Sequence, residues 1–307
     1  MVLNNIQVNP GISKIQLRSE SLERWLQRSP PSVLCHYTDQ SGLRGIIASG
    51  ELWATKVQYM NDTTEFKLAI DVAETVLKTK FGDSSAETFD LARSILSRLR
   101  GISHANICTV SFCENPDLLS QWRGYSGKTA GYSIGLRADA LLSVAKEQGC
   151  QLGACIYSNR DQNIIVQELI DDLVQNFVDL RRVQDLHTAC LHLRNCFQMS
   201  LVKCGAFFKD ESFKEENEWR IVTSLKGYND DEFDFREGTS MLVPYCKVPI
   251  RGDSWEGKIS SVVVGPCPHP EEAKKAVEGL LIKYSAESED RGSSGSVTPS
   301  KIPYRHW

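Results

Sequence analysis

Hydrophobic and polar positions change period along the chain, and each change marks an expected element. Apolar residues at helical spacing between Ser19 and Pro30 predict a short opening helix. Residues 32–55 then predict a strand, a helix of about three turns ending at Gly50, and a second strand. The opening of the chain is therefore expected to be helix, strand, helix, strand.

Two longer segments, 64–100 and 162–203, repeat apolar residues every three or four positions, and each predicts two helices. Six shorter runs are typical of strands: 106–113, 131–137, 150–158, 218–225, 240–250 and 258–266. The segment 114–130 reads as a polar loop, and a helix is expected over 138–149. A last helix is expected over 269–284. Because strands cluster at both ends, the pattern predicts one α+β domain with a mixed sheet.

The domain boundaries follow from the same pattern. Residues 1–30 read as a lead-in with one short helix, and residues 31–307 as a single domain. The uninterrupted helical periodicity predicts that residues of about 160–205 form a helical insertion between strands.

Composition narrows the function. A formal charge of -4 and a pI near 5.9 argue against general nucleic-acid binding, although a local basic groove would fit that balance. Ten cysteines without a C-x-x-C pair, and no secretion signal, favour free thiols in a reducing cytosol. No apolar run reaches the roughly 18 residues of a membrane span, so we expect a soluble cytoplasmic protein with no membrane partner.

Common chemical motifs are absent. The chain has no phosphate-binding loop, dinucleotide fingerprint, zinc-protease motif or hydrolase elbow. The segment "HTACLHLRNC" holds His187, Cys190, His192 and Cys196, but helical geometry sends these side chains to nearly opposite sides. We therefore expect no metal.

Several short motifs remain, scattered from residue 34 to residue 305. They are "HYT" at His36, "ELWAT", "YMND", "SFC" with "SQWRGY", "ENEWR" and "SKIPYR". Their order resembles the bacterial family called domain of unknown function 2971, with Cys113 where that family often has serine. The family in turn resembles a remote branch of the ADP-ribosyltransferase fold. That likeness implies an ADP-ribosyltransferase-like core that binds NAD as substrate.

The resemblance implies a catalytic role for Glu218, whose carboxylate would stabilise the oxocarbenium-like transition state of nicotinamide loss. Glu216 lies two residues earlier on the same face of the strand and would activate the acceptor. His36 would hold an NAD ribose hydroxyl. The alternatives are a solvated acidic strand start for the two glutamates and a satisfied core histidine for His36.

Further residues are candidates for binding NAD. Tyr37 and Thr38 flank the histidine, and the Thr38 hydroxyl shares its face. Arg123 has a guanidinium suited to pyrophosphate, with an ion pair to Glu218 or Asp62 as its alternative. Aromatic stacking and polar support are the roles expected of the remaining four candidates, Trp53, Tyr59, Ser111 and Gln121.

We therefore expect an NAD-dependent ADP-ribosyltransferase or NAD glycohydrolase, acting on protein, RNA, DNA or water, as a toxin or antiphage effector. Two alternatives stay open: a noncatalytic nucleotide-sensing or interaction module, and RNA 2'-phosphotransferase-like chemistry. The catalytic interpretation predicts that His36, Arg123 and Glu218 line one pocket, with Arg220 orienting Glu218.

Overall fold

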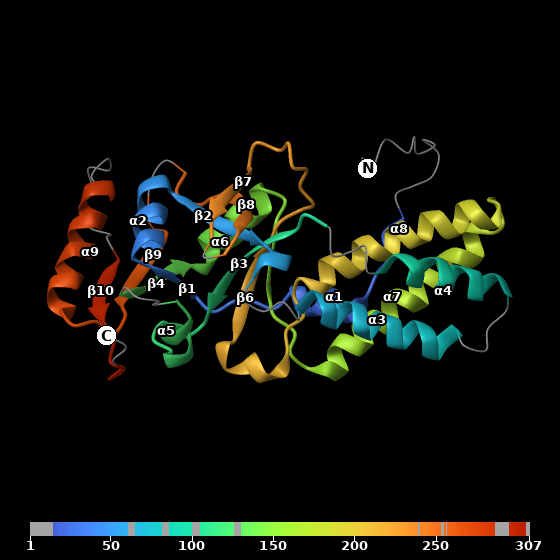
Figure 1. Ribbon diagram of the computed structural model, residues 1–307, viewed down its shortest axis with the longest axis horizontal. Coiled ribbons are helices and arrows are strands. Elements are labelled where there is room, and N and C mark those ends of the chain that lie inside the picture. Colours follow the sequence, from blue (N-terminus) through green and yellow to red (C-terminus); the bar gives the residue numbers. More distant parts are fainter. Residues whose placement is uncertain are drawn as a thin grey trace.

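Ten strands in the described part of the chain form one mixed sheet at one end of an elongated molecule (Figure 1). The computed structural model describes residues 15–60, 65–81, 86–99, 105–125, 130–238, 240–252, 255, 257–285 and 295–304. The strands are β1 (Val33–Asp39), β2 (Glu51–Lys56), β3 (Cys108–Cys113), β4 (Gly131–Arg137), β5 (Gln151–Ala154), β6 (Glu218–Val222), β7 (Phe233–Glu237), β8 (Leu242–Pro249), β9 (Ile259–Val264) and β10 (Ser296–Pro299).

Helices cover the sheet and build the other end of the molecule (Figure 1). They are α1 (Glu20–Leu26), α2 (Gln40–Ser49), α3 (Glu65–Phe81), α4 (Ala86–Leu99), α5 (Leu119–Tyr125), α6 (Ala138–Glu147), α7 (Asn159–Leu180), α8 (Leu186–Gly205) and α9 (Pro270–Ser285), with short 3-10 turns η1 (Val57–Tyr59) and η3 (Glu211–Glu216). The predicted α+β class with a mixed sheet is confirmed.

The sheet runs β10-β9-β4-β1-β3-β2-β8-β7, with β6 beside β3 and β5 beside β6. β10 and β9 are parallel, and the other pairs are antiparallel. Buried residues of α2, α6 and α9 share one core with this sheet, including Leu43, Leu141 and Val277. We call this part the sheet lobe.

β3 is the strand on which the sheet divides. Along one edge, β3 pairs with β6 from Thr109 to Cys113. Along its other edge, Cys108 and Thr109 pair with β2, whereas Cys113 pairs with Cys35 of β1. β1 and β2 thus share an edge of β3 and diverge around Ser111. We call this place the split.

The helical lobe has its own core and draws on more of the chain than predicted. Residues of α7 and α8 pack with α3 and α4, and α1 packs against α7. The sequence placed the two pairs of helices separately and assigned only residues of about 160–205 to an insertion. In the structure, α3 and α4, which lie between β2 and β3 in the chain, pack against α7 and α8. Each pair of helices buries its apolar stripe against the other. Although α7 has 22 residues, no helix of the described residues is apolar enough to cross a lipid bilayer.

Local signals explain the elements that were predicted well. The Ser19 hydroxyl accepts from the Leu22 N–H and caps α1, and Gly50 ends α2 at a φ of 76°, where a side chain is disfavoured. Other elements were missed. α5 lies inside the predicted polar loop, β7 was not predicted because its alternating polar residues resemble a loop, and the short β10 was not predicted either.

Candidate functional site

His36 lies where β1 leaves β3, at the split. Its Nδ1 is 2.9 Å from the carbonyl oxygen of Ser111. A carbonyl only accepts hydrogen bonds, so Nδ1 carries the proton and Nε2 keeps a lone pair in the neutral ring. Among the described residues none bonds to Nε2. The half-buried histidine therefore has one nitrogen occupied and one available.

Electrostatics keeps this ring neutral. Burial lowers the pKa of His36, and the hydrogen bond to the Ser111 carbonyl only partly opposes that effect. The ring also lies against Phe112, with centroids 5.9 Å apart. At neutral pH, His36 is thus an uncharged group that can accept one hydrogen bond.

The strand register places His36 and Glu218 on different faces of the sheet. Cys35, Cys113 and Glu218 are direct partners across β1, β3 and β6, so these three side chains share one face. His36 is the neighbour of Cys35 and therefore points to the other face, as its contact with Phe112 also shows. The prediction that His36, Arg123 and Glu218 line one pocket is wrong.

Glu218 instead belongs to a buried cluster of four charged residues, which we call the junction cluster. Arg220 donates from Nε to Glu218 Oε1 at 2.7 Å and from Nη2 to Oε2 at 3.2 Å. Lys209 donates to the same Oε2 and, at 2.7 Å, to Glu216 Oε2. The predicted orientation of Glu218 by Arg220 is confirmed, and both carboxylate oxygens of Glu218 are engaged.

These ion pairs decide the protonation of the cluster. Burial alone would raise the pKa of Glu218, yet Arg220 and Lys209 hold it at about 2. Burial alone would lower the pKa of Lys209, whereas Glu218 and Glu216 raise it. Each charge is thus compensated by a neighbour. Glu218 is 2% exposed and has no uncompensated charge with which to stabilise an oxocarbenium ion.

The junction cluster links the two lobes. Arg220, on a strand of the sheet lobe, donates from Nη1 to the carbonyl of Ala206 at the end of α8. The fully buried Gln162 of α7 donates to the carbonyls of Ile156 and Lys209, at 2.6 and 3.0 Å. The backbone N–H of Glu218 donates to the hydroxyl of Tyr157 at 2.8 Å. The cluster therefore joins β6 to the ends of both long helices.

Arg123 takes no part in the junction cluster. It is exposed on α5, with its guanidinium 5.6 Å from the ring centroid of Tyr304. Nearby, Asp117 accepts from the Trp122 indole at 2.7 Å and from the Lys301 N–H at 2.8 Å. The "SQWRGY" and "SKIPYR" motifs thus meet through one aspartate.

The neighbours of His36 have mainly structural contacts. The Tyr37 hydroxyl donates to the Asn115 carbonyl at 2.8 Å and accepts from the Leu118 N–H at 2.9 Å, which leaves it little capacity for a ligand. Thr38 lies against the first turn of α2, since a Cβ at Gly42 would come within 1.9 Å of its Oγ1.

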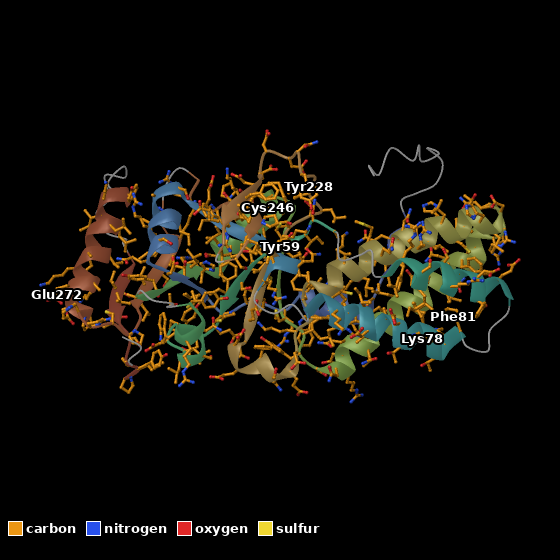
Figure 2. The ribbon with its side chains drawn as sticks, viewed as in Figure 1. Tyr59, Lys78, Phe81, Tyr228, Cys246 and Glu272 are labelled. Carbon is orange, nitrogen blue, oxygen red and sulfur yellow. The ribbon has the colours of Figure 1, made fainter. Side chains whose placement is uncertain are left out.

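The two candidate aromatic residues lie on different parts of the sheet lobe. Trp53 is 47% exposed and stacks on Tyr245 with centroids 4.5 Å apart. Tyr59 lies near Tyr228, and the Lys56 ammonium is 5.9 and 5.5 Å from the centroids of their rings (Figure 2). The two rings thus contact different partners, Trp53 the ring of Tyr245 and Tyr59 the ammonium of Lys56.

The remaining candidates give little indication of a role. Ser111 has a buried hydroxyl without a hydrogen-bond partner in the described structure, on the face opposite to His36. Gln121 is buried in α5. Asp62 and Arg305 lie outside the described residues. Within the described ranges, no group of three or more histidine, cysteine or acidic residues could hold a metal ion.

Sequence reasoning missed two residues in or near the junction cluster. Lys209 follows an apolar run and lies seven residues before Glu216, and no known motif contains a lysine and a glutamate at this spacing. Tyr125 is the last residue of α5, and 37% of its surface is exposed. Burial raises the pKa of its hydroxyl, and the negative charge of Glu218 raises it further. The prediction that Glu216 and Glu218 alternate along one strand is wrong, because Glu216 ends η3, Asn217 has a φ of 41°, and β6 begins only at Glu218. Lys209 joins the two carboxylates instead.

The comparison with protein families bears on the same segment. The family model described as protein of unknown function (DUF2971) matches residues 121–221, from α5 to β6. This part of the chain is similar to that family. The matched segment contains Tyr125 and the four residues of the junction cluster. No curated protein and no solved structure matches the chain.

Proposed function

We propose that this chain is a noncatalytic nucleotide-sensing module that binds a nucleotide of the NAD class at the split. The proposal is carried by His36, whose Nδ1 is held by the Ser111 carbonyl while Nε2 is available. A ribose hydroxyl is a suitable donor to a neutral imidazole nitrogen. The resemblance to the ADP-ribosyltransferase fold supports the same class of ligand.

β3 supplies a physical route from the split to the helical lobe. Ser111 accepts the hydrogen bond of His36 with its carbonyl, and it is the direct partner of Arg220 on β6. Arg220 in turn contacts Glu218 and the end of α8. A ligand that moves the His36 ring therefore acts on a strand that also anchors the junction cluster, which is the behaviour needed in a sensor.

ADP-ribosyl transfer is the second candidate, and Glu216 favours it. Its side chain is 19% exposed, and only Oε2 is paired in the described structure, with Lys209. An ionised carboxylate at the surface is able to activate an acceptor hydroxyl, on protein, RNA, DNA or water. The counter-argument is Glu218, whose charge is already neutralised by two cations.

Calorimetry with NAD, ADP-ribose and ADP tests the proposal, together with an assay for nicotinamide release. We expect the wild type to bind NAD without releasing nicotinamide, and His36→Ala to weaken binding about tenfold through loss of one hydrogen bond. The exposed His187 of α8 offers a matched control, since His187→Ala should leave binding unchanged. If the wild type binds none of the three nucleotides, the proposal fails.

The same assay separates the two candidates. Nicotinamide release by the wild type that is lost in Glu216→Gln would replace the sensor with ADP-ribosyl transfer. The pH dependence gives another readout. Because the pKa of His36 lies below its ordinary value of 6.5, binding should stay constant from pH 8 to 6.5 and weaken only at lower pH, where Nε2 becomes protonated.

A further inference from the structure

Cys35 and Cys113 face each other across β1 and β3 and are both free thiols. Direct partners on antiparallel strands have Cα atoms about 4.5 to 5.5 Å apart, inside the range of about 4.4 to 6.8 Å found for disulfides. We propose that Cys35 and Cys113 form a reversible disulfide site that takes a small hydroperoxide as its oxidant. The bridge would join β1 to β3 beside the split.

The surroundings allow this bridge without a large rearrangement. Both side chains lie on one face of the sheet, in a small core with Tyr37, Trp122 and Val263. Opposed Cβ atoms are about 4.5 to 5.5 Å apart, slightly more than the mean of about 3.8 Å in disulfides. β1 pairs with β3 at this one position and diverges beyond it, so a small approach disturbs few backbone hydrogen bonds.

The chemistry balances with one hydroperoxide. The Cys35 thiolate attacks the O–O bond, which forms a sulfenic acid and releases hydroxide or alkoxide. The Cys113 thiolate then attacks the Cys35 sulfur, the S–S bond forms, and a second hydroxide leaves. The two sulfurs lose two electrons, the peroxide gains them, and the two thiol protons end on the oxygen products. A thiol reductant reverses the bridge by exchange.

Reactivity of the pair is slow near neutral pH. Burial raises the pKa of Cys35 to about 11, and the neighbouring Ser133 side chain only partly opposes this effect. Burial also raises the pKa of Cys113, with the Glu218 and Glu216 carboxylates adding to the effect. Since the thiolate is the nucleophile, the rate of bridging should rise about tenfold per pH unit below that pKa.

A second pair of thiols provides an internal control. The sulfurs of Cys108 and Cys246 are only 3.2 Å apart, and both side chains are buried (Figure 2 labels Cys246). However, these residues lie on β3 and β8, which both pair with β2. β2 therefore lies between their backbones, so their Cα atoms are farther apart than those of direct strand partners, which is unfavourable for a disulfide.

Peptide mapping of the full chain after hydrogen peroxide treatment tests the proposal. Folded protein is incubated between pH 7 and 9, free thiols are alkylated, and unreduced peptides are identified by mass. We expect one bridged species, Cys35 with Cys113, that forms about tenfold faster per pH unit and disappears with dithiothreitol. Both single variants, Cys35→Ser and Cys113→Ser, should lose it, whereas Cys108→Ser should keep it.

Other outcomes contradict the proposal. A bridge between Cys108 and Cys246 would show that sulfur proximity rather than strand register decides the pairing. Oxidation of Cys35 or Cys113 to sulfinic acid without a bridge, or no reaction at pH 9, would show that the two thiols do not act together. Because mapping uses the wild-type protein first, the result does not depend on the folding of any variant.

Discussion

His36 and Glu218 are polar residues on neighbouring parts of one sheet, and the structure uses them in opposite ways. Glu218 has both carboxylate oxygens paired with Arg220 and Lys209 inside the junction cluster. His36 has one nitrogen bound to a carbonyl and the other available at the split. The comparison teaches that unused bonding capacity, rather than polarity in a strand, distinguishes a candidate ligand site from a structural contact.

The largest effect should come from Glu218→Gln. It leaves Lys209 and Arg220 buried with too little negative charge, and removal of one partner from a buried ion pair typically costs about 3 to 5 kcal/mol. We expect urea unfolding to show a loss of that order in the free energy of unfolding. Glu87→Gln, at the exposed pair with Arg181, should be indistinguishable from wild type.

Acid should weaken the junction cluster in a defined window. The pKa of Glu218 is about 2 in the folded chain against an ordinary value of 4.5, so its contribution is fully present above pH 4.5. That contribution, about 3 kcal/mol, is lost as pH falls from 4.5 toward 2. Between pH 4.5 and 2, the free energy of unfolding should change less with pH in Glu218→Gln than in the wild type. An equal change in both proteins would contradict the assigned ion pairs.

Gln162→Leu should have a smaller effect on the junction between the lobes. It removes the amide that donates to the Ile156 and Lys209 carbonyls and keeps a similar volume. Two buried carbonyls each lose one hydrogen bond, so we expect a loss of about 1 to 3 kcal/mol in the free energy of unfolding. The half-buried Gln167 of the same helix provides the control, because Gln167→Leu breaks only a surface contact with Asp171.

His36→Ala should change stability least and sharpen the comparison most. It removes one hydrogen bond to a carbonyl, so we expect a loss of about 1 kcal/mol, well below that of Glu218→Gln. Thermal unfolding of the two variants side by side measures this order directly. If His36→Ala destabilises the chain as much as Glu218→Gln does, His36 is a structural residue and the ligand assignment is lost.

Much of the fold could be predicted because local chemistry decides it. The Ser19 cap, the Gly50 stop and the apolar periodicities lead to α1, α2, α7 and α8 without reference to other segments. The period of two in "ENEWR" likewise indicated that Glu218 and Arg220 would share a face, and they do.

The sequence by itself determined these elements and the family motifs, since caps, turns and periodicity depend on residues close along the chain. Only the tertiary structure decided what the motif residues contact. Strand register set His36 and Glu218 on different faces, and packing of two distant helix pairs created one lobe beside Lys209. Strand register and helix packing depend on segments far apart along the chain, and no local pattern encodes which of these segments will pair.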